Sequence, residues 1–223
     1  FAQKYLEYRG IRCTFVHVNK EDPDNFAGIG ALKDADLLFL SVRRRTPPKA
    51  QLDLIRAHLA KGKPLVGIRT ASHAFDREPP SQRHARWTQF DDEILGVDYR
   101  QHYGNRPPKD PATVIQATVS GSKHPILTGV TQDAFEAKSH LYKNKLVATT
   151  VTVLMTGTLS GRAEISEPVA WTNEVNGSRV FYTSLGGVGD FSLPAFQRLL
   201  LNGVLWALDK PLPPADPRVV ARK

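Results

Sequence analysis

The chain contains the stretch Pro64-Leu65-Val66-Gly67-Ile68-Arg69-Thr70-Ala71-Ser72-His73, in which a short apolar run is followed at once by a polar turn. Successive apolar side chains from Leu65 to Ile68 are typical of a parallel strand that is buried on both faces. In open α/β sheets, ligands bind beyond the carboxyl ends of such strands, where the connecting loops converge. Arg69 and the turn after it are therefore the first place where we expect function.

The segments before this stretch alternate between helix and strand patterns. Residues 1–9 are expected to end a helix that Gly10 closes, and residues 11–18 and 35–40 are expected to be strands. A helix capped by Thr46, with apolar residues at helical spacing, is expected to lead into the next strand. Repeated strand-helix-strand units predict a parallel sheet with helices on both faces.

The second half of the chain is richer in strand patterns than the first. Residues 113–119, 148–154 and 169–172 are extended candidates. Asn176-Gly177 is the preferred sequence of a type I′ turn, so residues 179–183 are expected to close a β-hairpin. We expect this hairpin to form an antiparallel edge of the sheet.

The C-terminal part is expected to contain one long helix and an extended tail. Ser192 is expected to cap the helix, with Pro194 in its first turn. Prolines from Pro211 onward exclude a continuing helix. The sequence thus predicts a single α/β domain over residues 1–210, with a doubly wound, mostly parallel, flavodoxin-like sheet, and a tail over residues 211–223.

Composition restricts the classes of function open to the chain. No apolar run approaches the roughly 20 residues that a membrane helix needs, so we expect a soluble protein with no membrane partner. The net charge of +8 suits an anionic partner, but the basic residues are scattered and no nucleic-acid-binding motif is present. The only cysteine, Cys13, excludes an internal disulfide and is expected to pack as a small apolar residue.

Two predicted strand ends carry cationic side chains to the same edge of the sheet. Three consecutive arginines, residues 43–45, follow the strand at residues 35–40, and Arg69 and His73 follow the next strand. Guanidinium groups favour carboxylate or phosphate ligands, which they hold bidentately. The alternative for residues 43–45 is a solvated loop paired with acidic groups, whereas the position of Arg69 favours function.

Five segments along the chain form a recognisable series, namely Lys63-Pro64-Leu65-Val66-Gly67-Ile68-Arg69-Thr70-Ala71-Ser72-His73-Ala74-Phe75, Gln101-His102-Tyr103-Gly104-Asn105, Ser139-His140-Leu141-Tyr142-Lys143, Glu167-Pro168-Val169-Ala170-Trp171-Thr172 and Val180-Phe181-Tyr182-Thr183-Ser184-Leu185-Gly186. In this order they resemble the trehalose-utilisation (ThuA-like) family over nearly the whole chain. The resemblance implies a fold similar to class I glutamine amidotransferases and a loose association with carbohydrate metabolism.

The resemblance also indicates which reaction is absent. Gly67-Ile68-Arg69 stands where the amidotransferases have a Gly-Ile-Cys elbow. An arginine, with a pKa above about 12, is neither a nucleophile nor a general base at neutral pH, so we expect no glutaminase activity. Family members commonly carry a histidine after the Leu-Gly that ends the last strand, but here Gly187 stands there, which argues against acid-base chemistry at that position.

The candidate site combines the strand-end residues with those that the resemblance adds. His73 is the first choice for a general acid or base, and the alternative is that it only orients Arg69 or caps a turn. Two histidine and tyrosine pairs, in residues 102–103 and 140–142, either bind sugar hydroxyls or are structural. We expect no metal site and no cofactor. The predicted substrate-binding residues are Arg43, Arg44, Arg69, Thr70, Ser72, His102, Tyr103, His140, Tyr142, Gly187 and Asp190.

The resemblance also carries an expectation about the N-terminus. The family's sheet begins with a strand before the first helix, in the middle of the sheet, and this chain begins at Phe1 within the helix pattern. We therefore expect a longer native chain whose additional strand completes the sheet. Two cellular locations are compatible with the sequence: the cytoplasm, and the outside of the cell if a leader peptide precedes Phe1.

Two classes of function follow from the sequence. The first is an enzyme acting on a sugar or a sugar-derived acid or ketone, as a hydrolase or isomerase, with His73 as the acid-base group. The second is a non-catalytic module that binds a sugar or an anion. Nucleic-acid binding is the weakest reading, for want of a motif. The expected partner is a small sugar-like or anionic molecule, and a homo-oligomer is compatible with the sequence.

Overall fold

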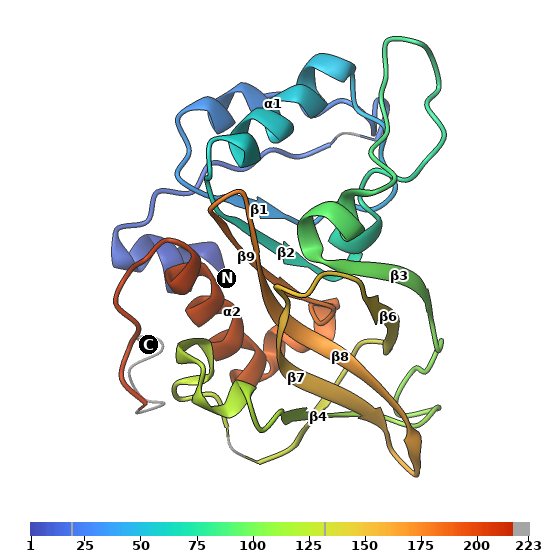
Figure 1. The fold of residues 1–223 in the computed structure, drawn as a ribbon, viewed down its shortest axis with the longest axis vertical. Helices are drawn as coiled ribbons and strands as arrows, with labels where there is room; N and C mark the ends of the chain where they lie inside the picture. Colours follow the sequence, from blue (N-terminus) through green and yellow to red (C-terminus); the bar gives the residue numbers. More distant parts are fainter. Residues whose placement is uncertain (19, 132, 216–223) are drawn as a thin grey trace.

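A seven-stranded mixed sheet forms the centre of the fold in the computed structural model, which describes residues 1–18, 20–131 and 133–215 (Figure 1). From one edge to the other, the strands are Leu38–Leu40 (β1), Leu65–Ile68 (β2), Ser178–Thr183 (β9), Arg162–Val175 (β8), Thr152–Leu159 (β7), Thr113–Ala117 (β4) and Phe135–Ala137 (β5). β1, β2 and β9 are parallel, and every later neighbouring pair is antiparallel. The α/β class is confirmed.

The sheet is mostly antiparallel, which corrects the expected mostly parallel, doubly wound arrangement. Two-residue turns join β7 to β8 and β8 to β9, and such short connections allow only antiparallel neighbours. In the second turn Asn176 and Gly177 have φ angles of 51° and 79°, as the type I′ prediction requires. The hairpin is not at an edge, because β9 pairs with both β2 and β8.

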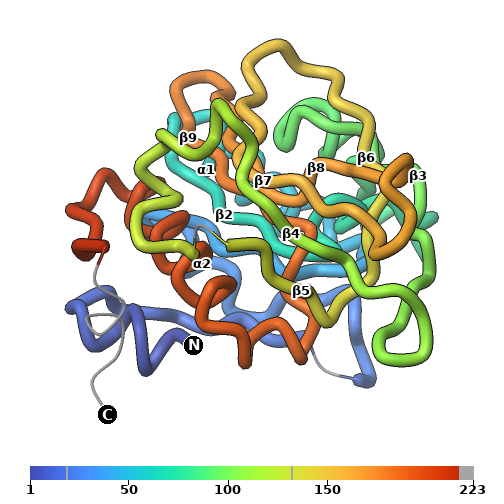
Figure 2. Tube along the Cα trace, turned by 90° about the horizontal axis from the view of Figure 1, so that it is seen from below, coloured from blue at the N-terminus to red at the C-terminus, as the bar shows by residue number. Residues whose placement is uncertain are grey.

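Two long helices, α1 (Lys49–Ala60) and α2 (Pro194–Ala207), pack against opposite faces of the sheet (Figure 2). Leu52 of α1 belongs to the same buried cluster as Leu65 of β2, whereas Leu199 of α2 belongs to the cluster that contains Val66 of β2. Alternate residues of a strand face opposite sides of the sheet. The apolar run in β2 therefore fills both layers of the core.

Three local predictions are wrong. Residues 11–18 do not form the expected strand: none of the described strands pairs with them, and Phe15 is 57% exposed. Thr46 does not cap α1, since the helix begins three residues later, with Pro48 at the N-cap position and no side-chain cap. Ser192 does not cap α2, since its hydroxyl donates to the carbonyl of Gly189. The expectation of a further strand that completes the sheet stays a prediction.

A second, two-stranded antiparallel sheet pairs β3 (Val97–His102) with β6 (Tyr142–Leu146).

The tail predicted over residues 211–223 is described only to residue 215, and its remainder lies outside the described residues. Within the described ranges, no helix combines the length and the apolar character that crossing a membrane requires. Short helical turns occupy Ala2–Leu6, Glu7–Arg9, Ile29–Lys33 (η3), Arg69–His73 (η4), Asp91–Leu95 (η5), Gly121–Lys123, Pro125–Leu127 and Val188–Ser192 (η8).

The contact between α2 and the sheet depends on Gly203. A Cβ atom there would lie 2.2 Å from Cδ1 of the fully buried Phe181. We expect Gly203→Ala to lower the free energy of unfolding by about 1–3 kcal/mol through overpacking, as measured by urea denaturation. Gly30→Ala is the matched control, since a Cβ atom there meets nothing within 4 Å. Equal stability of the two variants would contradict this account of the packing.

Candidate functional site

The chain leaves β2 through a tight elbow at the start of η4. Arg69 has a φ angle of +49°, which few non-glycine residues adopt, and its carbonyl accepts a hydrogen bond of 2.5 Å from the hydroxyl of the buried Tyr182. A side chain at Gly67 would lie 3.1 Å from the Tyr182 ring and 3.3 Å from the Cβ atom of Ala71. A small residue before the elbow thus keeps β9 close to the turn.

The Arg69 side chain holds two other segments against this elbow. Its Nη1 atom donates to the carbonyls of His140 and Ser184, at 2.8 and 2.9 Å. The guanidinium carbon lies 4.1 Å from the centre of the Tyr142 ring, in cation-π geometry. Arg69 therefore joins the end of β9 to the segment before β6, which is a structural role whatever else it does.

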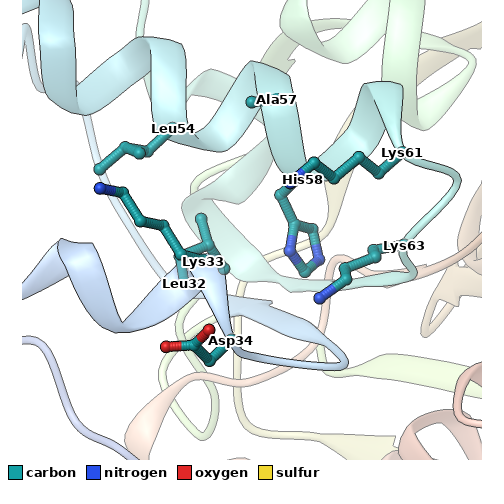
Figure 3. Close-up of a pocket in the computed structure, with 8 residues that line it drawn as sticks. All are labelled: Leu32, Lys33, Asp34, Leu54, Ala57, His58, Lys61 and Lys63. Atoms are coloured by element: carbon teal, nitrogen blue, oxygen red, sulfur yellow. The ribbon is translucent and has the colours of Figure 1, made fainter.

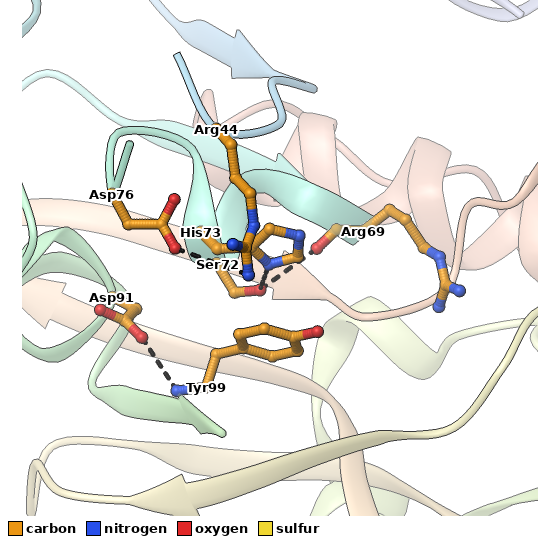
Figure 4. A network of polar contacts seen from close by, with 7 residues as sticks. All are labelled: Arg44, Arg69, Ser72, His73, Asp76, Asp91 and Tyr99. Carbon is orange, nitrogen blue, oxygen red and sulfur yellow. Dashed lines mark hydrogen bonds and ion pairs between the residues drawn. The ribbon is translucent and has the colours of Figure 1, made fainter. Parts of the chain in front are cut away.

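The two arginine-bearing loops lie side by side, as predicted. The backbone N–H of Arg44 donates to the carbonyl of His73 at 3.0 Å, and that of Arg45 donates to Ala74 at 2.7 Å. The Arg44 side chain is exposed and lies 3.9 Å from the carboxylate of Asp76. In Figure 4 the Arg44 guanidinium points toward His73, whereas that of Arg69 points away from it.

His73 lies at the centre of the cluster and is only 6% exposed. Its Nδ1 atom is 3.1 Å from the hydroxyl of Ser72, and its ring stacks on Tyr99 with centroids 4.3 Å apart (Figure 4). Burial and then the positive charges of Arg44, Arg43 and Arg69 lower the pKa of His73 from 6.5 to about 3. The imidazole is therefore neutral at physiological pH.

The small β3-β6 sheet extends this contact into a strip of rings. The Tyr99 and Tyr142 centroids are 4.9 Å apart, those of Tyr142 and His102 are 6.3 Å apart, and those of His102 and His140 are 4.9 Å apart. A register shift between Tyr99 and Gln101 lets Tyr99 oppose Asn144 while His102 opposes Tyr142. Tyr99 and His102, three residues apart, thereby share the face that carries Tyr142. We call these five rings, His73, Tyr99, Tyr142, His102 and His140, the ring strip.

Some predicted residues have other partners. The Tyr103 hydroxyl donates to Glu167 at 2.8 Å. The fully buried Asp190 accepts hydrogen bonds from the Ser139 hydroxyl and from the backbone N–H groups of Gly186, Gly187 and Lys138. The N–H of Gly187 is thus taken by the chain itself. Thr70 lies half-buried on η4.

Sequence reasoning missed Tyr99 and Asp76. The alternation of residue types along β3 could have indicated a strand there, but only the register shift brings Tyr99 onto the face of the other rings. Asp76 belongs to the loop after the elbow, and its Oδ1 atom is buried without a hydrogen-bond partner among the described residues. Nothing in the local pattern distinguishes it from an ordinary loop aspartate.

One group of carboxylates could hold a cation. Asp91, Asp92 and Asp98 bring one oxygen each within 4.8 Å of one another. Burial raises the pKa of Asp91 to about 6, although its carboxylate accepts a hydrogen bond from the N–H of Tyr99. Asp98 is also paired with Arg100. The expectation that the protein has no metal site stays a prediction.

Two cavities, of about 460 and 420 Å³, lie elsewhere in the molecule. Both are lined partly by α1, and neither includes a predicted site residue; Figure 3 shows the first. Beside the ring strip, the side chains of Arg43, Arg44 and His102 are exposed.

The two hydrogen bonds that the Arg69 side chain donates to the carbonyls of His140 and Ser184 should contribute to the stability of the fold. Arg69→Ala removes two charge-assisted hydrogen bonds to carbonyls, so we expect urea denaturation to show a loss of about 2–3 kcal/mol in unfolding free energy. Arg43→Ala, at an exposed position, should stay within about 0.5 kcal/mol of the wild type. If Arg69→Ala lost no more unfolding free energy than Arg43→Ala, this structural role of Arg69 would be refuted.

His73 predicts a pH dependence of stability. The unfolded chain takes up the proton near pH 6.5 and the folded chain only near pH 3, so the neutral ring contributes stability that is complete above pH 6.5 and is lost as the pH falls toward 3. Between pH 7 and pH 4, the unfolding free energy of the wild type should fall more steeply than that of His73→Gln. The exposed His17, changed to Gln, should keep the wild-type slope. If the unfolding free energies of the wild type and of His73→Gln fell equally with pH, the buried neutral imidazole would be contradicted.

Solved structures with a similar fold include two ThuA-like proteins. The one from Bacteroides uniformis is 20% identical, with a TM-score of 0.57 over 80% of this chain and 71% of its own. The one from Parabacteroides merdae is 17% identical, with a TM-score of 0.60 over 95% and 87%. Gan42B, a GH42 β-galactosidase from G. stearothermophilus, is 16% identical, with a TM-score of 0.52 over 82% of this chain but 22% of its own. At these identities the likeness shows the fold alone.

No curated protein sequence matches the chain. The sequence pattern of one family, described as trehalose utilisation (ThuA), matches residues 2–207. This match confirms the resemblance found in the sequence and spans most of the chain. The chain therefore belongs to the ThuA trehalose-utilisation family.

Proposed function

We propose that this ThuA protein binds a small sugar-derived acid on the ring strip, beside Arg43 and Arg44. The observation that carries the proposal is the continuous row of rings with exposed arginines next to it. Arg43, Arg44 and His102 are exposed and Tyr99 is half-buried, so all four can meet a ligand. The family description supports a ligand of the carbohydrate class.

Charge favours an acid over a neutral sugar. Among the described residues, Arg44 forms an ion pair with one acidic group, Asp76, at 3.9 Å, which is a weak contact between partly exposed groups. Its guanidinium keeps donors for a carboxylate, which it can hold with two parallel hydrogen bonds. Electrostatic repulsion around His73 comes from Arg43, Arg44 and Arg69 together, so a bound anion would relieve it.

The rings supply the sugar-binding part of the site. Phenol and imidazole groups present apolar faces for C–H groups and polar edges for hydroxyl groups, which is the combination that small-molecule sites use. The Nδ1 atom of His140 is buried and has no hydrogen-bond partner among the described residues. Such an atom is stabilised by a ligand or water that reaches it.

Catalysis at the same site is the second candidate. Ser72 and His73 stand next to each other on the elbow, with the hydroxyl 3.1 Å from Nδ1. At a pKa of about 3 His73 is a weak base, but an anion beside Arg43 and Arg44 would raise that pKa toward neutrality. The substrate would then activate its own acid-base group.

The proposal predicts that a carboxylate is required for tight binding. Glucuronate and glucose share a ring and differ in charge, so calorimetric titration should show glucuronate binding at least about tenfold more tightly. Arg44→Gln should weaken glucuronate binding about tenfold, whereas Arg162→Gln, an exposed change on β8, should not. Equal affinity for the two sugars, or an unchanged affinity in Arg44→Gln, would rule the proposal out.

Turnover separates the two candidates. Sugar acids and keto-sugars are incubated with the wild type and with His73→Gln, and products are followed by NMR. Turnover by the wild type that His73→Gln loses supports catalysis. Binding without turnover in both proteins leaves a binding module only.

A further inference from the structure

A further arginine, Arg106, stands near the His102 end of the ring strip and takes no part in the sugar-acid site described above. It lies in the loop that follows β3, and its side chain is exposed. None of the ion pairs among the described residues includes it. The guanidinium group of Arg106 therefore keeps its charge and its donors for a ligand.

The loop that carries Arg106 is fixed to the segment before β6. The buried side chain of Asn105 accepts a hydrogen bond of 2.9 Å from the backbone N–H of Leu141. The same side chain donates to the carbonyl of Pro111 and to the hydroxyl of Thr113, both at 3.0 Å. Leu141 is flanked in the chain by two members of the ring strip, so these hydrogen bonds hold the loop beside them.

Asp110 orders the backbone of Arg106 and leaves its side chain free. The backbone N–H of Arg106 donates to the Asp110 carboxylate at 2.9 Å, and the N–H of Asp110 donates to the carbonyl of Arg106 at 3.1 Å. The carboxylate thus closes a turn and forms no ion pair with the guanidinium group. The result is a positioned backbone with an available cation.

Electrostatic effects on the rings assign the free arginines to opposite ends of the strip. Burial, followed by the charges of Arg69 and Arg106, lowers the pKa of His102. At the other end the Arg44 guanidinium points toward His73 (Figure 4). After burial, the charge of Arg44 is the largest cause of the lowered pKa of that ring. Arg106 thus belongs to the His102 end and Arg44 to the His73 end.

The arginine at the middle of the strip is already engaged. Arg69 lies over the Tyr142 ring, but its Nη1 atom donates to two backbone carbonyls. The ring centroids of His73 and Tyr142 are 5.9 Å apart, and those of Tyr142 and His102 are 6.3 Å apart. Two steps between rings therefore separate the ends, which is a span for a small molecule.

We propose that the ligand of the ring strip carries an anionic group at each end, one bound by Arg44 and the other by Arg106. This inference rests on the proposed function and narrows its ligand from a sugar acid to a sugar diacid. Guanidinium groups hold carboxylates through paired hydrogen bonds, so two of them at opposite ends select both the charge and the length of the ligand. Arg106 is the residue that determines specificity for the second carboxylate.

Gluconate and glucarate test the proposal, because they share a hydroxylated six-carbon chain and differ in one terminal carboxylate. Calorimetric titration at equal ionic strength should show glucarate binding about tenfold more tightly than gluconate. Arg106→Gln should bring the ratio of the two affinities close to one, whereas Arg44→Gln should weaken the binding of both acids. Arg162→Gln removes the same charge at an exposed position on β8 and should keep the wild-type ratio.

Histidine NMR locates the second carboxylate. An anion beside His102 favours its protonated ring, so glucarate should raise the pKa of His102 and gluconate should not. Equal affinity for the two acids, or an unchanged ratio in Arg106→Gln, would overturn the diacid and leave the sugar-acid site standing. If neither acid bound, the proposed function would fail, and the diacid with it.

Discussion

The elbow at Arg69 fixes the position of every group around the ring strip. Its φ angle of +49° is unfavourable for a side chain with a Cβ atom, and it persists because the surroundings hold it from two directions. The hydroxyl of the buried Tyr182 fixes the Arg69 carbonyl, and the guanidinium holds the carbonyls of His140 and Ser184. Backbone and side chain of one residue thus join β2, β9 and the segment before β6.

The change of strand direction at β9 explains why the ring strip lies where it does. Among the described strands, only β1, β2 and β9 run in parallel, so only their carboxyl ends deliver loops to a common edge. Beyond β9 the strands alternate in direction, and their turns are divided between both ends of the sheet. The β3-β6 sheet supplies the remaining rings, which the parallel part alone could not provide.

His73 acts in this site as a neutral hydrogen-bonding group, because burial and the neighbouring arginines lower its pKa. The guanidinium groups beside it are planar and suit a carboxylate. A chain with a net charge of +8 can present such a local anion site without a continuous basic face.

Sequence alone determined the α/β class, the family, the buried strand that ends at Arg69 and the Asn176-Gly177 hairpin, because each depends on local periodicity or turn chemistry. It could not determine that β9 lies inside the sheet, since pairing order depends on contacts between distant segments. Only the tertiary structure placed Tyr99 against His73, through a register shift that no local pattern encodes, and turned the Arg69 side chain toward backbone carbonyls. The physical reason is the same in each case: side-chain partners are chosen by packing between elements, and a single stretch of sequence contains only one side of that contact.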